Sequence, residues 1–260
     1  MAKLALRAVV CAFALPVAAM ILGAFLKPEV AVSLQGTRPR WDILPSLGQF
    51  RAAVGDPVLW ERLKNSATLA AGSLALFLPI SIASGVMMSC AGRRVRKGLT
   101  ALYVLSLLMP FQVIMLPVFK LSIIAGVYNS HAPVMLLAGT MPMGALVIAA
   151  LVSRIGKEQW QAASLETSSP AKTLNKVILP QIAGGILLML LMGFAEVWNM
   201  VEQPLILIED RSLQPLSLSL NDIVMGSDGY PFAGAVIYAL PVLALFFLAA
   251  IAMRAKAKKP

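Results

Sequence analysis

The chain of 260 residues is poor in the residue types on which many enzymatic and metal sites depend. It has one histidine, His131, and two cysteines, Cys11 and Cys90, which both lie in apolar stretches. These numbers exclude a histidine-rich metal site, a disulfide framework and a cysteine-based metal site. Charged residues make up only 13% of the chain, against about 25% in a typical soluble domain. Too few polar side chains remain to cover a globule of this size in water, which excludes an ordinary soluble enzyme, a disordered chain and a nucleic-acid-binding domain.

Long apolar stretches are abundant instead, since hydrophobic residues make up 59% of the chain. A helix needs about 20 apolar residues to cross the hydrocarbon layer of a membrane. Stretches of this kind lie at about 9–26, 65–90, 98–119, 134–152, 178–200 and 232–253. The sequence therefore predicts an all-α integral membrane protein, with one transmembrane domain over residues 1–260 and about six helices. Pro79, Pro110, Pro117, Pro142 and Pro241 are expected to kink these helices.

The first apolar stretch has a basic start, at Lys3 and Arg7, which is also typical of a signal peptide. Its 18 apolar residues, from Val9 to Leu26, are more than the 7–15 of a signal-peptide core. We therefore expect the helix to be retained. The number of helices is then even, and both termini lie on one side of the membrane.

The placement of lysine and arginine indicates which side this is, because cytoplasmic loops carry an excess of them. With both termini in the cytoplasm, 14 of the 22 basic residues lie on the cytoplasmic side, and only Glu158 and Glu166 of the 12 acidic residues do. The cluster from Arg93 to Lys97 and the C-terminal tail contribute most. The loop from Lys27 to Lys64 holds six basic residues and opposes this assignment, but four acidic residues partly balance them. Both termini are predicted to be cytoplasmic.

The predicted cytoplasmic loop at 153–178 carries a motif. It contains Gln161-Ala162-Ala163-Ser164-Leu165-Glu166-Thr167-Ser168, and Pro180 stands at the twentieth position counted from Gln161. This resembles the EAA loop of binding-protein-dependent ABC importers, whose pattern is Glu-Ala-Ala, two variable residues, Asp-Gly-Ala and a later proline. Gln161, Glu166, Thr167 and Ser168 depart from that pattern. Thr167 resists the left-handed turn that the family's glycine permits, and Ser169-Pro170 offers a substitute helix start.

Other stretches resemble one branch of these importers, the carbohydrate permeases related to the smaller maltose-permease subunit. They run from Met109 to Pro117 and from Phe194 to Pro204, and Asn65-Ser66 opens the second helix as in that branch. The resemblance covers about residues 15–248. It implies a type I ABC importer permease fold in the bacterial cytoplasmic (inner) membrane, surrounded by lipid. It also implies three partners: a second homologous permease subunit, an ATPase dimer and an extracytoplasmic solute-binding protein.

The resemblance implies that the loop forms a short coupling helix that docks on the ATPase. The residues assigned to this role are Glu158, Trp160, Gln161, Ala162, Ala163, Glu166, Thr167 and Pro180. Two adjacent alanines permit close approach to a partner, and Glu166 falls on the same helical face. Trp160 fits an anchor at the membrane interface equally well, and Glu166 also fits a solvated charge.

A solute pathway is predicted near the outer end of the fifth helix, at Glu196, Trp198 and Asn199. A buried acid is costly in lipid, so Glu196 is expected to face a water-filled cavity or another subunit. Trp198 offers a flat face for stacking on a sugar, and Asn199 offers a donor and an acceptor. An interfacial tryptophan beside a structural asparagine is an equally good interpretation. His131 is expected to be a solvated loop residue.

The predicted function is that of a transmembrane subunit of an ATP-driven ABC importer, which moves a sugar, oligosaccharide or related polar solute by alternating access. The chain has no Gly-rich loop ending in Gly-Lys-Ser/Thr, so it is not expected to be an enzyme. A separate ATPase then binds ATP and Mg²⁺, and this chain needs no cofactor. The alternative is a stand-alone secondary transporter or channel, for which Glu196 is the main candidate relay. A membrane-embedded enzyme lacks a Ser/His/Asp or two-His-plus-acid set, given the single histidine.

Overall fold

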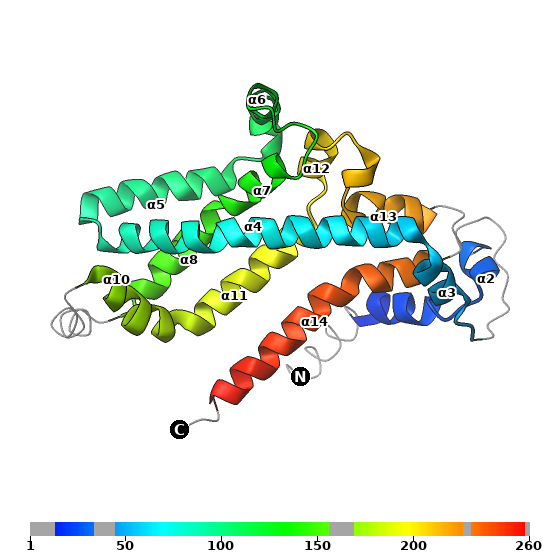
Figure 1. Cartoon of the computed structure of the whole chain (residues 1–260). Helices are drawn as coiled ribbons and strands as arrows, with labels where there is room; N and C mark the ends of the chain where they lie inside the picture. Colours follow the sequence, from blue (N-terminus) through cyan, green and yellow to red (C-terminus); the bar gives the residue numbers. More distant parts are fainter. Residues whose placement is uncertain (1–13, 34–44, 156–168, 226–229, 258–260) are drawn as a thin grey trace, which may run out of the picture. The chain divides into compact units, whose positions relative to one another are not determined.

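The computed structural model describes residues 14–33, 45–155, 169–225 and 230–257, and every regular element in these ranges is helical (Figure 1). A helix at Ala14–Gly23 comes first. The further elements are α2 (Pro28–Ser33), α3 (Gly48–Gly55), α4 (Pro57–Cys90), α5 (Arg93–Leu108), α6 (Phe111–Ile124), α7 (Ala132–Gly139), α8 (Pro142–Val152), α10 (Pro170–Thr173), a π-helical turn (Leu174–Ile178), α11 (Leu179–Trp198), α12 (Glu202–Leu207), a 3₁₀ turn (Arg211–Leu213), α13 (Leu216–Met225) and α14 (Pro231–Ala257).

Four segments of the described chain are long and apolar enough to cross a membrane. They are Pro57–Cys90, Ala132–Val152, Leu174–Trp198 and Pro231–Arg254, and the pair α5–α6 makes a fifth if it counts as one broken span. The apolar helix at Ala14–Gly23 is shorter. The prediction of an all-α, multi-pass membrane protein is confirmed. The number of six helices and the cytoplasmic position of both termini stay predictions.

The predicted helix at 98–119, with a kink at Pro110, is two helices in the structure. The chain bends by 93° between α5 and α6. Pro110 has no N–H to donate, and its ring forces Met109 out of the helical region, to φ −75° and ψ 117°. Pro110 therefore ends one helix instead of kinking it. Pro79, Pro117 and Pro241 lie inside helices, whereas Pro142 begins α8.

The second predicted helix, at 65–90, begins earlier than expected. Asp56 accepts a hydrogen bond of 2.8 Å from the amide of Val58, and Pro57 occupies the first helical position. An aspartate cap followed by proline is a strong start signal for a helix. The charged residues of the first two turns, Glu61, Arg62 and Lys64, hide this start from a search for uncharged stretches.

One unit of the structure comprises residues 1–66 and 214–243. Its core contains Ala24, Ala53, Leu59, Leu216, Tyr230 and Ala233. Two side chains in the third turn of α4 hold the start of α13: Ser66 Oγ accepts from the amide of Leu216 at 2.8 Å, and Asn65 Nδ2 donates to the carbonyl of Gln214 at 3.1 Å. Asn65-Ser66 therefore fixes where α13 begins.

The other unit comprises residues 67–213 and 244–260. Its main core contains Phe77, Ile148, Val152, Ile178, Ile182 and Met189, from α4, α8, the π-helical turn and α11. Small residues allow the helices to approach closely. A methyl group at Gly85 would lie 2.5 Å from Ile148 Cβ, and one at Gly144 would lie 1.9 Å from Ser81 Oγ. Close packing on glycine is typical of helix pairs in membranes.

Candidate functional site

The C-terminal end of α11 carries the three residues predicted to line a solute pathway. Trp198 is the last residue of α11, and Asn199 caps it, with its amide 3.2 Å from the carbonyl of Ala195. Asn199 Nδ2 donates to the same carbonyl at 2.7 Å. Glu196 is exposed one turn earlier. Met200 and Val201 then lead into α12, which packs against α6 and α7 (Figure 1).

A polar hollow of about 340 Å³ opens at this helix end. Its lining is Glu196, Asn199, Met200, Val201, Glu202 and Gln203. Two carboxylates and two side-chain amides thus come from eight consecutive residues. They line one hollow because the chain breaks between α11 and α12. Carboxylates accept hydrogen bonds, and side-chain amides both donate and accept them. The hollow is therefore suited to a ligand with several hydroxyl groups.

Trp198 does not line this hollow. Its side chain is buried, with 3% of its surface exposed, and its ring stacks on Phe194 at 5.3 Å between ring centroids. The structure thus places the predicted sugar-stacking face inside the protein. Glu196 and Asn199 both line the hollow, whereas Trp198 packs inside the protein at the same helix end. A role of these residues toward a solute stays a prediction.

Gln112 and Glu202 are a pair that the sequence analysis missed. Gln112 Nε2 donates to Glu202 Oε1 at 2.7 Å, which joins the first turn of α6 to the first turn of α12. The pair fixes the carboxylate of Glu202 at the rim of the hollow. Two features of the sequence could have indicated this pair. Gln112 is a polar residue in an apolar stretch, two residues after Pro110, and Glu202-Gln203 follows shortly after a spanning helix.

A second set of polar contacts joins the α6–α7 turn to the loop after α12. Asn129 has a left-handed backbone, with φ 55°, and its Oδ1 accepts from the amides of Glu209 and Asp210 at 2.9 and 2.8 Å. His131 Nε2 lies 2.7 Å from the carbonyl of Leu213. A carbonyl only accepts, so Nε2 carries the proton. His131 lies in the loop before α7 as expected, but it is half-buried and bonded instead of fully solvated.

The loop after α12 is also ordered by its own acid. Asp210 Oδ1 accepts from the amide and the hydroxyl of Ser212, at 2.9 and 2.8 Å. These hydrogen bonds favour the charged carboxylate and lower the pKa of Asp210 below its usual value of 3.8. The backbone bond is the larger cause, and the side-chain bond adds to it.

The predicted ATPase-coupling residues Glu158, Trp160, Gln161, Ala162, Ala163, Glu166 and Thr167 lie outside the described residues. Pro180 is described, as an exposed residue in the first turn of α11. The expected helix start at Ser169-Pro170 is confirmed. The carbonyl of Ser169 accepts from the amides of Lys172 and Thr173 at 3.0 and 3.1 Å, and α10 begins at Pro170.

A π-helical turn at Leu174–Ile178 connects α10 to α11. A π turn holds one more residue than an α turn, and it is a rare feature found often at functional sites. Its last residue, Ile178, is fully buried in the core with Phe77 and Ile182. The end of the predicted coupling loop is therefore tied directly to the packed interior of this unit.

These elements define the class of the protein: an all-helical, multi-pass membrane protein with a polar hollow at the end of a spanning helix. Residues 75–259 match the family described as binding-protein-dependent transport system inner membrane component, and the chain belongs to this family. It is thus a multi-pass component of the cytoplasmic (inner) membrane. The resemblance to importer permeases that the loop motif indicated is confirmed.

Several curated proteins are similar over most of their length. The diacetylchitobiose uptake system permease protein DasC of Streptomyces coelicolor is 26% identical over 204 residues, which cover 76% of this chain and 73% of the relative. The osmoprotective compounds uptake permease protein GgtD of Synechocystis is 26% identical over 244 residues, covering 85% and 81%. The arabinooligosaccharides transport system permease protein AraQ of Halalkalibacterium halodurans is 23% identical over 190 residues, covering 72% and 68%.

A solved structure has the same fold. A chain in the crystal structure of a bacterial ABC transporter involved in the import of the acidic polysaccharide alginate superposes with a TM-score of 0.77 and 14% identity, over 96% of this chain and 93% of that one. The likeness supports the predicted type I importer permease fold, because it extends over nearly the whole of both chains.

Proposed function

We propose that the chain is a transmembrane subunit of an ATP-driven importer for an oligosaccharide or a related polyhydroxy solute. The observation that carries the proposal is the family match over residues 75–259, together with relatives named for diacetylchitobiose, arabinooligosaccharide and lactose transport. The solved alginate importers agree with a saccharide, although their sequences are distant.

The polar hollow supplies chemistry that suits such a solute. Glu196 and Glu202 accept hydrogen bonds from hydroxyl groups, and Asn199 and Gln203 both donate and accept. Its volume of about 340 Å³ lies at the lower end of the range for small-molecule sites, about 300–1,000 Å³. The hollow thus fits one part of a chain-like solute as it passes. Trp198, buried behind the hollow, acts as a positioning residue for Glu196 and Asn199.

The partners belong to the same proposal. A second homologous permease subunit completes the pathway, an extracytoplasmic binding protein delivers the solute, and an ATPase dimer supplies energy. ATP and Mg²⁺ bind to the ATPase, which is consistent with the lack of a phosphate-binding loop in this sequence.

The predicted coupling loop would transmit closure of the ATPase to α11. Ala162 and Ala163 lie at the closest approach to the ATPase, and Glu166 accepts hydrogen bonds from it. Movement then passes through α10 and the π-helical turn, because Thr173 is bonded to Ser169 and Ile178 is anchored in the core. The variants Ala163→Trp and Glu166→Lys are expected to lose ATPase recruitment. Normal recruitment with normal transport in both would remove the coupling role.

The experiment for the function as a whole is uptake in vesicles. The chain is co-expressed with a second permease subunit and an ATPase, the vesicles are loaded with ATP, and control vesicles receive no ATP. Uptake of a labelled oligosaccharide is expected to require ATP and the binding protein, and to persist when an uncoupler collapses the proton gradient. Uptake driven by the gradient without ATP would favour the secondary transporter instead.

A further inference from the structure

The polar hollow at the end of α11 carries a net negative charge. Its lining includes the carboxylates of Glu196 and Glu202, and no lysine or arginine belongs to it. These two are the charged residues of α11 and α12, and the helices that pack against α12, which are α6 and α7, add one more, Lys120. Lys120 follows Gln112, which contacts α12, by eight residues, or about 12 Å along α6. These four helices therefore bring no balancing positive charge to the lining.

The contacts of the two carboxylates do not neutralise them. Gln112 Nε2 donates to Glu202 Oε1 at 2.7 Å, but an amide is uncharged, so this bond orients the carboxylate and leaves its charge in place. Glu196 is exposed, and within the described ranges neither it nor Glu202 forms an ion pair. The exposed residues at 209–211 add two acids and one base. Charge of a single sign in a concave site with apolar walls produces a field that acts on an ion before it makes contact.

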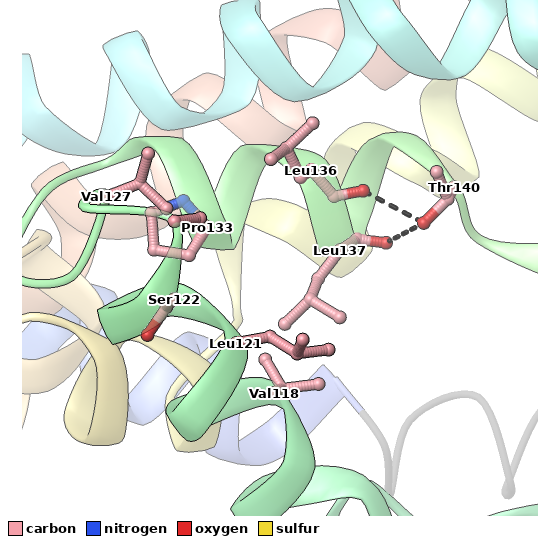
Figure 2. Close-up of a pocket in the computed structure, with 9 residues that line it drawn as sticks. Val118, Leu121, Ser122, Val127, Pro133, Leu136, Leu137 and Thr140 are labelled. Atoms are coloured by element: carbon pink, nitrogen blue, oxygen red, sulfur yellow. Dashed lines mark hydrogen bonds between the residues drawn. The ribbon is translucent and has the colours of Figure 1, made fainter.

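A second hollow, of about 280 Å³ and with a mostly apolar lining, lies between α6 and α7 (Figure 2). Its hydroxyl groups are used within their own helices. Ser122 Oγ donates to the carbonyl of Phe119 at 2.7 Å. Thr140 Oγ1 donates to the carbonyls of Leu136 and Leu137 at 2.9 and 3.2 Å, the bonds drawn in Figure 2. Of these two hollows, the polar one is therefore the one that offers hydrogen bonds to a saccharide.

The charge of the polar lining favours some solutes over others. A carboxylate only accepts hydrogen bonds, so hydroxyl groups and protonated amines are suitable partners for Glu196 and Glu202, and an amine adds the attraction of opposite charges. A carboxylate, sulfate or phosphate on the solute would bring acceptor against acceptor and like charge against like charge. Such repulsion is stronger beside a protein than in bulk water, because the effective dielectric constant is lower there.

We propose that the polar hollow selects solutes by charge: it admits neutral saccharides and saccharides with a protonated amine, and it disfavours acidic saccharides. This inference rests on the proposed function, because it requires that the solute passes the hollow. It narrows the solute class to neutral oligosaccharides and amino sugars. The solved importer with the same fold is described for an acidic polysaccharide, so the fold alone does not decide the charge of the solute.

The charge of the hollow is tested with thiol reagents on the full-length chain in its membrane complex. Cys11 and Cys90 are replaced by serine, and Asn199→Cys places a thiol in the lining. Two methanethiosulfonates of similar size, one with a trimethylammonium group and one with a sulfonate group, then react with this thiol. The ratio of the cationic to the anionic rate is expected to exceed the ratio for a small thiol in solution about tenfold, and to fall as salt is added.

Exchange of the two carboxylates shows whether they cause this ratio. Glu196→Gln together with Glu202→Gln is expected to return the ratio to its solution value. Glu209→Gln is the matched control, since it removes an exposed charge outside the lining, and it is expected to retain most of the ratio. Gln203→Cys repeats the measurement at a second lining residue. A solution-like ratio with both carboxylates present, an unchanged ratio without them, or no reaction at either thiol would overturn the proposal.

Selection among solutes is tested by uptake in the ATP-loaded vesicles. The probes are a neutral oligosaccharide that the unmodified complex takes up, its aldonic acid and its reductively aminated form, which add one negative or one positive charge at the same end. The same binding protein is used throughout, so that its own preference cancels when variants are compared. The double variant of Glu196 and Glu202 is expected to raise uptake of the aldonic acid relative to the neutral sugar about tenfold, which corresponds to about 1.4 kcal/mol. It is expected to lower the relative uptake of the aminated form.

The outcomes separate this inference from the proposed function. Uptake of the neutral sugar that depends on ATP, with the same relative uptake of the acid in the unmodified protein and the double variant, would overturn the charge selection alone. The absence of ATP-dependent uptake of any neutral oligosaccharide by the assembled complex would instead contradict the proposed function, and the charge selection with it.

Discussion

The side-chain amide of Gln49 donates a hydrogen bond of 2.7 Å to the main-chain carbonyl of Gly23. It donates a second bond, of 3.0 Å, to the carbonyl of Leu26, while its oxygen accepts from the amides of Phe232 and Ala233 at 3.2 and 3.3 Å. One fully buried side chain from α3 thus caps the end of the first helix and the start of α14. Helix ends leave backbone groups without partners, and buried ones must be satisfied.

We predict that Gln49→Leu lowers the stability of the protein by about 3 kcal/mol, because each buried polar group left without a partner costs about 1–3 kcal/mol. Thermal unfolding in detergent, followed by intrinsic tryptophan fluorescence, measures the change. Gln181→Leu is the matched control, since Gln181 is exposed on α11. Equal melting temperatures of Gln49→Leu and Gln181→Leu would show that the four hydrogen bonds of Gln49 contribute nothing to stability.

We predict that Gly144→Ala is destabilising and Gly184→Ala is not. A methyl group at Gly144 would lie 1.9 Å from Ser81 Oγ and 2.7 Å from the ring of Phe77, whereas at Gly184 it would meet no atom within 4 Å. Overpacking of this kind costs about 1–3 kcal/mol, and alanine in an open helical position is slightly favourable. The yield of folded protein on size-exclusion chromatography compares the two. A loss of the same size in both variants would contradict the close contact.

We predict that Asn129→Ala loosens the loop at 207–213. Alanine resists the left-handed backbone at this position and removes the acceptor of the Glu209 and Asp210 amides. Hydrogen exchange of these two amides is expected to speed up by about tenfold, for one lost bond pair of about 1.4 kcal/mol. Asn129→Gly, which relieves the strain but also lacks the acceptor, separates the two causes. Unchanged hydrogen exchange in both variants would show that Asn129 does not hold these two amides.

We predict that Glu196→Gln raises the KM of solute uptake about tenfold, because hydrogen bonds to a charged acceptor are worth about 1.5–3 kcal/mol. The exchange keeps the shape of the side chain and removes its charge. Glu209→Gln is the control, since Glu209 is exposed and does not line the hollow. An unchanged KM, with the complex assembled normally, would exclude Glu196 from the pathway. Asn199→Ala and Trp198→Ala then distinguish a contact residue from a positioning residue.

Hydropathy and charge were enough to predict the helical class and most spanning segments, because burial in lipid demands long uncharged stretches. They failed at helix ends. The start of α4 at Pro57 depends on a local cap at Asp56, and the end of α5 depends on the geometry that Pro110 imposes on Met109. Local rules of this kind are readable in a sequence, but they act over a few residues and leave average hydropathy unchanged.

The site was only partly predictable for a different reason. Glu196 and Asn199 could be found because they interrupt an apolar helix. The bond between Gln112 and Glu202 joins residues 90 positions apart, and that between Gln49 and Phe232 joins residues 183 positions apart. No pattern within one segment signals such a pair. Trp198 shows the converse: its type suggested an exposed stacking face, and tertiary packing against Phe194 decided otherwise.

The 34 residues of α4 make a rod of about 51 Å at 1.5 Å per residue, whereas the hydrocarbon layer measures about 30 Å. Even an α4 inclined by about 40° is about two turns longer than the layer, and the charged turns around Glu61 and Lys64 are suited to lie outside it. Asn65 and Ser66, which hold α13, follow directly after these charged turns. The start of α13 is therefore bonded to the charged end of α4, so a change of membrane thickness is expected to alter the inclination of α4 before it breaks these two hydrogen bonds.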